Sequence, residues 1–290
     1  MKKYSDTLIK KVGMNNFIKE IRLGSMLIAL IVIWGCSSDP ITENNNIIET
    51  AESYQALGYI EFPVGNDNLL AELDRGDRFG RDHDKIGDVN GDGVSDIVVG
   101  ARSDDDGEID AGAVYILFMN NNGTLKSYQK ISMISGGFSD TLHEGNFFGY
   151  GVAGIGDYDS DGIPDIAVSS PVPPNNSLYI IHLNSDGTVK SYTKNPNIIA
   201  EGLTAIGDIN GDKRIDLVAC NPGSDDGGRD RGAIDILFLN ENSYVNNSQI
   251  ITISSTRGGF GSGLEDGDKF GGREVALMGD IDGDGTIELA

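Results

Sequence analysis

The sequence Asp88-Val-Asn90-Gly-Asp92-Gly93-Val-Ser-Asp96 carries an oxygen-bearing side chain at its first, third, fifth and ninth positions. Three related stretches follow it: Asp157-Tyr-Asp159-Ser-Asp161-Gly162-Ile-Pro-Asp165, Asp208-Ile-Asn210-Gly-Asp212-Lys213-Arg-Ile-Asp216 and Asp280-Ile-Asp282-Gly-Asp284-Gly285-Thr-Ile-Glu288. Three of the four stretches have glycine at the sixth position, where a tight turn favours it. The shared spacing indicates four copies of one short loop.

Oxygens at this spacing suit a hard cation of calcium's size. Ca²⁺ takes six to eight oxygen ligands at roughly 2.3–2.6 Å, and a curled loop can supply most of them. Without a cation, the crowded carboxylates would repel one another and raise one another's pKa. Solvated acidic turns are the alternative, but four copies in register favour the metal interpretation. The predicted metal residues are Asp88, Asn90, Asp92, Val94, Asp96, Asp157, Asp159, Asp161, Ile163, Asp165, Asp208, Asn210, Asp212, Asp216, Asp280, Asp282, Asp284 and Glu288.

The residues that follow the loops argue against an EF-hand. An EF-hand loop needs a bidentate acid at its twelfth position, and the first three copies have Val99, Val168 and Ala219 there. Each copy instead runs into a short apolar segment, such as Ile97-Val98-Val99, that predicts a buried strand. The loops are therefore expected to join β-strands.

The surroundings of the loops are repeated as well. The opening acids of the four loops are 69, 51 and 72 residues apart, which is the scale of an array of supersecondary units. Phe-Gly pairs precede three of the loops, and apolar strands such as 113–118 follow them. Two of these strands lead into nearly identical hairpins, Asn122-Gly-Thr-Leu-Lys-Ser-Tyr128 and Asp186-Gly-Thr-Val-Lys-Ser-Tyr192. Each unit thus predicts four short antiparallel strands, which is one blade of a β-propeller.

The order of a Phe-Gly pair, an acidic loop and a turn such as Gly100-Ala101-Arg102 resembles the FG-GAP repeat of the integrin α-subunit propeller and of many bacterial surface proteins. The resemblance covers about residues 56–290 and implies structural calcium loops on one face and partners on the opposite face or the rim. The third unit departs from the pattern, with Ile199-Ala200 for Phe-Gly and Lys213 for glycine, so its site is expected to be the weakest.

The expected fold class is therefore all-β, an incomplete propeller of about three and a half to four blades. The family commonly has seven blades, so we expected a truncated product with exposed sheet edges and an exposed apolar blade face. No segment after the N-terminal region shows a helical period.

The N-terminal residues predict an export signal. Basic residues precede the apolar segment 26–34, which is too short to span a bilayer, although an uncleaved anchor is the alternative. The sequence Ile33-Trp34-Gly35-Cys36 resembles a bacterial lipobox, so residues 1–35 are expected to be removed and Cys36 to carry lipid. Residues 36–55 would then form a flexible tether of some 25 Å. The expected location is the bacterial cell envelope, at the outer membrane or cell surface, with only the lipid in the membrane.

The composition limits the choice of partner. A net charge of −23 disfavours nucleic acid, which needs a basic patch. An anchored propeller that binds a surface or matrix protein is the preferred interpretation. A non-catalytic, carbohydrate-associated propeller is the alternative, weakened because the single tryptophan, Trp34, lies in the signal. A structural fragment without a partner is the third possibility. With Cys36 lipidated, no disulfide can form, so calcium would have to stabilise the fold.

An enzyme is not expected. His83, His143 and His182 lie in unlike segments, without a nucleophile motif or the spacing of metal-binding histidines. The clustered carboxylates are already assigned to loops, which leaves no separate acid/base pair. The tripeptide Arg75-Gly76-Asp77 spells an adhesion motif, but the repeat alignment explains it as the turn before Phe79-Gly80. Cys220 follows an apolar strand and is expected to be buried.

Overall fold

A computed structural model describes residues 67–259, 263–272, 274–284 and 287–290. The predicted signal (1–35), the tether (36–55) and the lipidation site Cys36 lie outside these ranges. Within them, no helix combines the length and the apolar character needed to cross a membrane.

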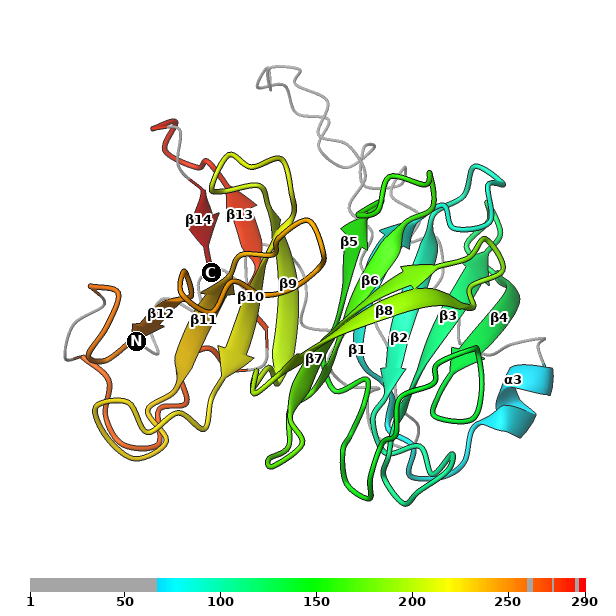
Figure 1. The fold of residues 1–290 in the computed structure, drawn as a ribbon, viewed down its shortest axis with the longest axis horizontal. Coiled ribbons are helices and arrows are strands. Elements are labelled where there is room, and N and C mark those ends of the chain that lie inside the picture. Colours follow the sequence, from blue (N-terminus) through cyan, green and yellow to red (C-terminus); the bar gives the residue numbers. More distant parts are fainter. Residues whose placement is uncertain (1–66, 260–262, 273, 285–286) are drawn as a thin grey trace, which may run out of the picture. The chain divides into compact units, whose positions relative to one another are not determined.

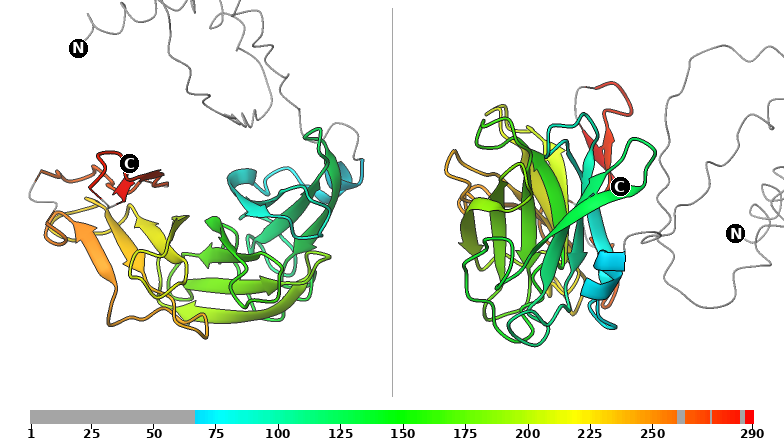
Figure 2. Two further views of the ribbon diagram at one scale, coloured as in Figure 1. Left: turned by 90° about the horizontal axis from the view of Figure 1, so that it is seen from above. Right: turned by 90° about the vertical axis from the view of Figure 1, so that its right-hand side faces the viewer.

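The described residues form four antiparallel sheets that follow one another in chain order (Figures 1 and 2). The first sheet contains β1 (Phe79–Gly87), β2 (Asp96–Ala101), β3 (Ala113–Met119) and β4 (Leu125–Ile131). The second contains β5 (Val152–Gly156), β6 (Asp165–Ser170), β7 (Ser177–Leu183) and β8 (Val189–Pro196). The third contains β9 (Gly202–Gly207), β10 (Asp216–Asn221), β11 (Ala233–Leu237) and β12 (Ile251–Ser254), and the fourth only β13 (Leu277–Gly279) and β14 (Glu288–Leu289). The prediction of an incomplete propeller with four-stranded blades is confirmed.

The hairpins form where the sequence predicts them. Strand β3 pairs with β4 in a register that places Ile116 opposite Gln129, and β7 pairs with β8 in the same way. The turn glycines Gly123 and Gly187 adopt φ angles of 81° and 79°, a left-handed region that glycine enters without steric penalty. In both hairpins the glycine N–H donates to an asparagine carbonyl, Asn120 or Asn184, at 2.8 Å.

The apolar cores lie between successive sheets. Along β3, Val114 and Ile116 belong to the core shared with the second sheet, whereas Tyr115 and Leu117 belong to the core on the other face. This alternation follows from the period of two in a strand. The central strands β3 and β7 are buried along their whole length because apolar residues cover both of their faces.

A short helix, α3 (Asp67–Glu72), precedes the first sheet, and the sequence analysis did not predict it. Its Leu69 is fully buried in the core cluster that also contains Tyr115 and Leu117. Six residues are too few for a helical period to be visible in the sequence, and the burial of Leu69 holds the helix against the sheet. The helix therefore helps to cover the outer face of the first sheet.

The two-stranded fourth sheet does expose apolar side chains. Leu277, Met278 and Ile281 are 44%, 51% and 59% exposed, and no other described strand pairs with β13 or β14. Here the expectation of an exposed apolar surface is met within the described residues.

Glycines allow adjacent sheets to approach closely. A Cβ atom on Gly100 would lie 2.1 Å from the carbonyl oxygen of Gly149, the glycine of the second Phe-Gly pair. A Cβ atom on Gly149, whose φ is +83°, would lie 2.3 Å from the carbonyl oxygen of Ala113. The preceding residue, Phe148, is fully buried and packs edge-on against Tyr179 at a centroid distance of 5.5 Å. The Phe-Gly pair thus places a ring in the core and lets the next backbone contact the previous sheet.

Candidate metal centre

Each acidic loop joins the first strand of a sheet to the second, and the loops lie at the upper end of the sheets in Figure 1. In the first loop, the N–H of Asp92 donates to Oδ1 of Asp88 and to Oδ1 of Asn90, both at 3.0 Å. The N–H of Gly93 donates to Oδ2 of Asp88 at 2.7 Å. The backbone thereby curls around its own side-chain oxygens and holds them on the inside of the turn.

The other three loops repeat this geometry. In the second loop, Asp161 N–H donates to Asp157 and Asp159 at 2.9 and 3.2 Å. The third and fourth loops show the matching pairs from Asp212 to Asp208 and Asn210, and from Asp284 to Asp280 and Asp282, at 2.9–3.1 Å. All four predicted loops therefore share the pair of hydrogen bonds that the fifth-position N–H donates.

The third loop adopts the turn despite its lysine. Lys213 has a φ of 71°, where Gly93 and Gly162 have 85° and 91° in the first two loops. A side chain in this region is strained, which agrees with the expectation that this loop is the weakest of the four.

The ninth-position acids of the first three loops are buried and anchor the loops to the strands. Asp96 accepts the N–H groups of Val89 and Met119, both at 3.0 Å. Asp165 has the same arrangement, with Tyr158 at 2.9 Å and Leu183 at 3.0 Å. Burial outweighs these bonds and raises the pKa of Asp96 above its ordinary value.

The equivalent acid of the third loop lacks one of these partners. Asp216 accepts the N–H of Ile209 at 3.0 Å, but its buried Oδ1 has no hydrogen-bond partner among the described residues. Strand β11 ends at Leu237, so it supplies no N–H at the place where Met119 and Leu183 donate in the first two sheets. Burial raises the pKa of Asp216 to about 6.

Glu288 takes the place of aspartate in the fourth loop without loss of the anchor. Its Oε2 accepts the N–H of Ile281 at 2.6 Å, which is the bond that Asp96 makes to Val89 in the first loop. The longer side chain therefore reaches the same backbone group.

Carboxylates converge within single loops. Oxygens of Asp157, Asp159 and Asp161 lie within 4.8 Å of one another, and the same holds for Asp280, Asp282 and Glu288. Asparagine replaces aspartate at the third position of the first and third loops, so those loops bring fewer carboxylates together.

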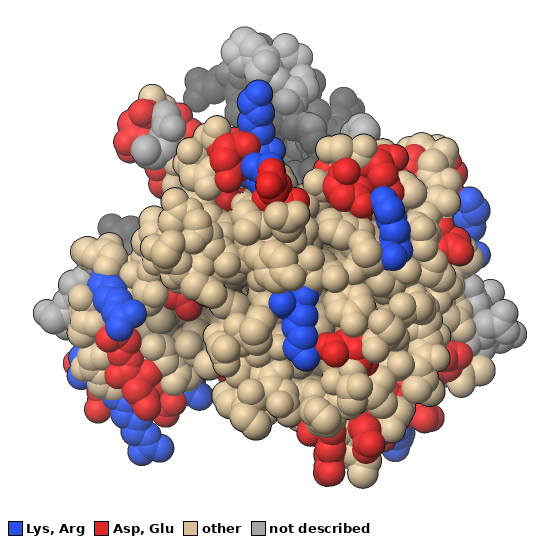
Figure 3. All heavy atoms as spheres, viewed as in Figure 1, with Lys and Arg blue, Asp and Glu red and all other residues tan. Residues whose placement is uncertain are grey.

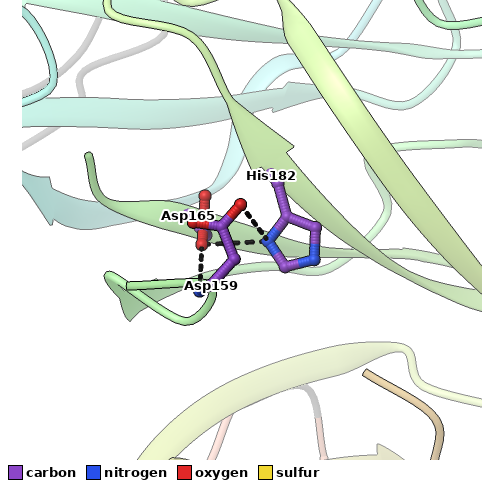
Figure 4. A group of neighbouring side chains, drawn as sticks. All are labelled: Asp159, Asp165 and His182. Atoms are coloured by element: carbon purple, nitrogen blue, oxygen red, sulfur yellow. Dashed lines mark hydrogen bonds and ion pairs between the residues drawn. The ribbon is translucent and has the colours of Figure 1, made fainter. Parts of the chain in front are cut away.

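A histidine joins the second loop. Nδ1 of His182, on β7, lies 3.0 Å from Oδ2 of Asp165 and 3.9 Å from Oδ2 of Asp159 (Figure 4). The other ring nitrogen, Nε2, lies 3.1 Å from the hydroxyl of Ser243, in the third sheet's outer hairpin. The hydrogen bond to Asp165 raises the pKa of His182. The ring of His182 is buried and both of its nitrogens have partners within the protein.

Two lysines from the hairpins approach the loop carboxylates. Nζ of Lys126 lies 2.7 Å from Oδ2 of Asp92. Nζ of Lys190 lies 2.7 Å from Oδ2 of Asp159 and 2.6 Å from Oδ2 of Asp161. These ammonium groups hold the pKa values of the Asp92 and Asp161 carboxyl groups below their usual range. Figure 3 shows basic side chains lying against clusters of acidic ones on the face in view.

The residues present fit a divalent cation. The donors are carboxylate and amide oxygens, which hard cations prefer, and a positive ammonium group already lies among them in two loops. Asp88, Asn90 and Asp92 of the first loop, with their counterparts in the other three, would supply the side-chain ligands. Val94 and Ile163 could offer only a carbonyl oxygen, and their N–H groups donate to Asp92 and Asp161.

Sequence reasoning missed Lys126, Lys190 and His182 as neighbours of the loops. The two lysines occupy the same position in the repeated hairpin sequences, Gly-Thr-Leu-Lys and Gly-Thr-Val-Lys. This repetition is the sequence feature from which an equivalent role for both lysines could have been predicted. His182 has no such signal, because the matching residue of the first sheet is Phe118.

Cys220 is fully buried, as predicted, and burial raises the pKa of its thiol to about 12.

Comparison with known proteins identifies the repeats. The FG-GAP-like repeat family matches residues 88–168 and 157–219. Human integrin alpha-6 is 35% identical over 119 residues, which are 40% of this chain and 9% of the integrin. Integrin alpha-PS5 of Drosophila melanogaster is 29% identical over 151 residues, 48% of this chain and 14% of the integrin. Residues 88–219 are therefore similar to FG-GAP-like repeats, and part of the chain is similar to integrin α-subunits.

A second kind of relative carries an enzyme's name. Bovine phosphatidylinositol-glycan-specific phospholipase D is 28% identical over 179 residues, 56% of this chain and 21% of the phospholipase. The chain spans about a fifth or less of each of these relatives.

Proposed function

We propose that this protein is a calcium-binding, lipid-anchored propeller that acts as an adhesion or protein-interaction module at the bacterial cell surface. The observation that carries the proposal is the fourfold recurrence of one curled, oxygen-lined loop. Three of the four copies lie within the residues that match FG-GAP-like repeats. In this account the chain is not an enzyme, and its partner is a surface or matrix protein.

Calcium would act as a structural element. Bound in a loop, it would neutralise carboxylates that the fold holds close together, such as the three within 4.8 Å in the second loop. Because the loop joins the first two strands of a sheet, the ion would also fix the start of β2, β6, β10 or β14. A ligand that binds only the folded chain stabilises it by RT ln(1 + [Ca²⁺]/Kd), about 2.7 kcal/mol per site at a hundredfold excess over Kd.

The proposed anchor is the lipid on Cys36, which lies outside the described residues. Metabolic labelling with a fatty-acid analogue tests it: the label should appear in the wild type, disappear in Cys36→Ser and remain in Cys220→Ser. Label retained by Cys36→Ser would contradict the anchor.

Protein and glycan arrays test the proposed interaction. The protein is applied once after removal of calcium by a chelator and once after calcium has been restored. It should bind a protein target only in the presence of calcium. Binding to glycans alone would indicate a carbohydrate-associated propeller instead of a protein-interaction module. Binding to neither array in calcium would contradict the interaction role.

A further inference from the structure

Three equivalent positions meet at the end of the sheets opposite the acidic loops. The residue after the Phe-Gly pair is Arg81 in the first sheet and Tyr150 in the second, and the matching residue of the third sheet is Glu201. The guanidinium of Arg81 lies 5.7 Å from the centroid of the Tyr150 ring, and the Tyr150 hydroxyl donates to Oε2 of Glu201 at 2.9 Å. The three side chains thus form one row across three sheets.

Arg102, the residue after β2, adds a second guanidinium to this row. Its Cζ lies 4.4 Å from the centroid of the Tyr150 ring and 5.1 Å from that of Phe147. Arginine stacks on aromatic faces in this manner and keeps its in-plane N–H groups free for hydrogen bonds. The rings therefore hold the guanidinium in place without using its donors.

The donors of these two arginines have no protein partner. Arg102 is only 8% exposed, yet neither its guanidinium nor that of Arg81 forms an ion pair or hydrogen bond with another described residue. Nε of each is buried and unpaired. Seven of the other basic residues of the described chain lie within ion-pair distance of a carboxylate, namely Lys126, Lys130, Lys190, Lys194, Arg229, Arg231 and Arg257.

Unpaired buried donors are rare and unfavourable, so they require an explanation. In a chain with 45 acidic and 22 basic residues, a carboxylate partner would be easy to provide, but no described carboxylate lies within 4.0 Å of either guanidinium. Glu201 accepts the hydroxyl of Tyr150, and Asp110 is not within 4.0 Å of Arg102. A ligand oxygen is the partner that the two guanidinium groups lack.

We propose that Arg81 and Arg102, held by Tyr150 and Phe147, bind a single carboxylate group of a protein partner, such as an aspartate or glutamate side chain. This inference rests on the proposed interaction role and names the chemistry of its partner. The planar fork of a guanidinium matches a carboxylate, and such charge-assisted bonds are about twice as strong as neutral ones.

The charge of the chain favours a lone carboxylate over a polyanion. With a net charge of −23, the surface would repel the successive charges of a polyuronate, whereas one carboxylate on a peptide brings only the group that the arginines need. Repulsion from more distant acids is screened beyond about 8 Å at physiological salt. A protein segment is therefore the favoured source.

NMR of the arginine Nε–Hε groups tests the proposal on the full, calcium-supplied chain. The probes are the peptides acetyl-Gly-Glu-Gly-amide and acetyl-Gly-Gln-Gly-amide, and an oligogalacturonate. The Glu peptide should shift the Arg102 and Arg81 signals in a saturable manner, with at least tenfold weaker binding of the Gln peptide. The exposed Arg229 serves as the reference signal.

Variants separate binding from folding. Arg102→Gln and, independently, the half-buried Arg81→Gln should each weaken binding of the Glu peptide about tenfold, whereas Arg229→Gln should leave it unchanged. Equal shifts with both peptides, or shifts no larger than at Arg229, would overturn the proposal. Saturation by oligogalacturonate alone would overturn the peptide assignment. Since the thermal response to calcium is measured separately, failure here leaves the metal loops untouched.

Discussion

Nζ of Lys190 lies 2.6 Å from Oδ2 of Asp161, so an ammonium group from the hairpin occupies the mouth of the second acidic loop. A second cation in that loop would have to compete with this ammonium for the same oxygen. Lys190→Met should therefore raise the apparent affinity for calcium by about two- to fivefold, the range expected for an exposed ion pair. Isothermal titration with calcium measures the change.

Lys85→Met is the matched control for Lys190→Met. Lys85 is exposed on β1, and no described carboxylate lies within ion-pair distance of its side chain. The control should bind calcium as the wild type does. A weaker affinity in Lys190→Met would show that the lysine supports the loop and does not compete with the ion.

His182 connects the second and third sheets through Asp165 and Ser243. Replacement of His182 by alanine leaves a buried carboxylate with one partner fewer and opens a cavity, so the free energy of unfolding should fall by about 2–4 kcal/mol. Denaturant unfolding in chelator measures the loss. A double-mutant cycle with Ser243→Ala should give a coupling of about 1 kcal/mol, and strict additivity would contradict the bridge.

Asp82 makes the stability depend on pH. This residue of β1 accepts the N–H of Val152 at 2.8 Å, and burial raises its pKa to about 7. Between the unfolded pKa of about 4 and about 7, the folded chain holds more protons than the unfolded chain. The free energy of unfolding should therefore fall as the pH rises through this window.

Asp82→Asn should flatten that part of the pH profile, because the amide keeps an acceptor for Val152 and cannot ionise. The effect is at most about 4 kcal/mol, and less because Asp82 is partly exposed. Asp186→Asn is the control: hydrogen bonds from Thr188 lower the pKa of Asp186, so its contribution is lost only as the pH falls. An unchanged slope between pH 4 and 7 in Asp82→Asn would contradict the assignment.

Gly149→Ala should destabilise the fold by more than about 2 kcal/mol, because the residue has a positive φ and its Cβ would meet the Ala113 carbonyl. Gly156→Ala is the matched control, since Gly156 has a φ of +67° but open space around its Cβ. The control should lose only about 1 kcal/mol. Thermal unfolding compares the two, and equal losses would show that sheet contact is not the reason for the Phe-Gly glycine.

The strands and turns of each blade could be predicted from the sequence because local sequence signals specify them. Asn-Gly and Asp-Gly turns, β-branched runs and the repeated loop determine strand order, and the hairpins at Gly123 and Gly187 form where those signals stand. The internal hydrogen bonds of the loops could likewise be expected from the spacing of Asp88, Asn90 and Asp92.

Contacts between units could not be predicted in this way. His182 and Ser243 are 61 residues apart, and Arg81 meets Tyr150 only because successive sheets stack. Helix α3 depends on the burial of Leu69, a tertiary contact that leaves no periodic pattern in six residues. The unpaired Oδ1 of Asp216 results from the early end of β11, which the sequence does not reveal because residues 233–238 resemble residues 113–118.

The most direct test of the account is the melting temperature of the full chain measured by calorimetry, first in chelator and then in excess calcium. We expect calcium to raise the melting temperature, and Asp161→Ala to reduce that rise more than Asp212→Ala, because the third loop holds a strained lysine. An identical melting temperature with and without calcium would contradict the central claim that the acidic loops bind the ion and stabilise the propeller.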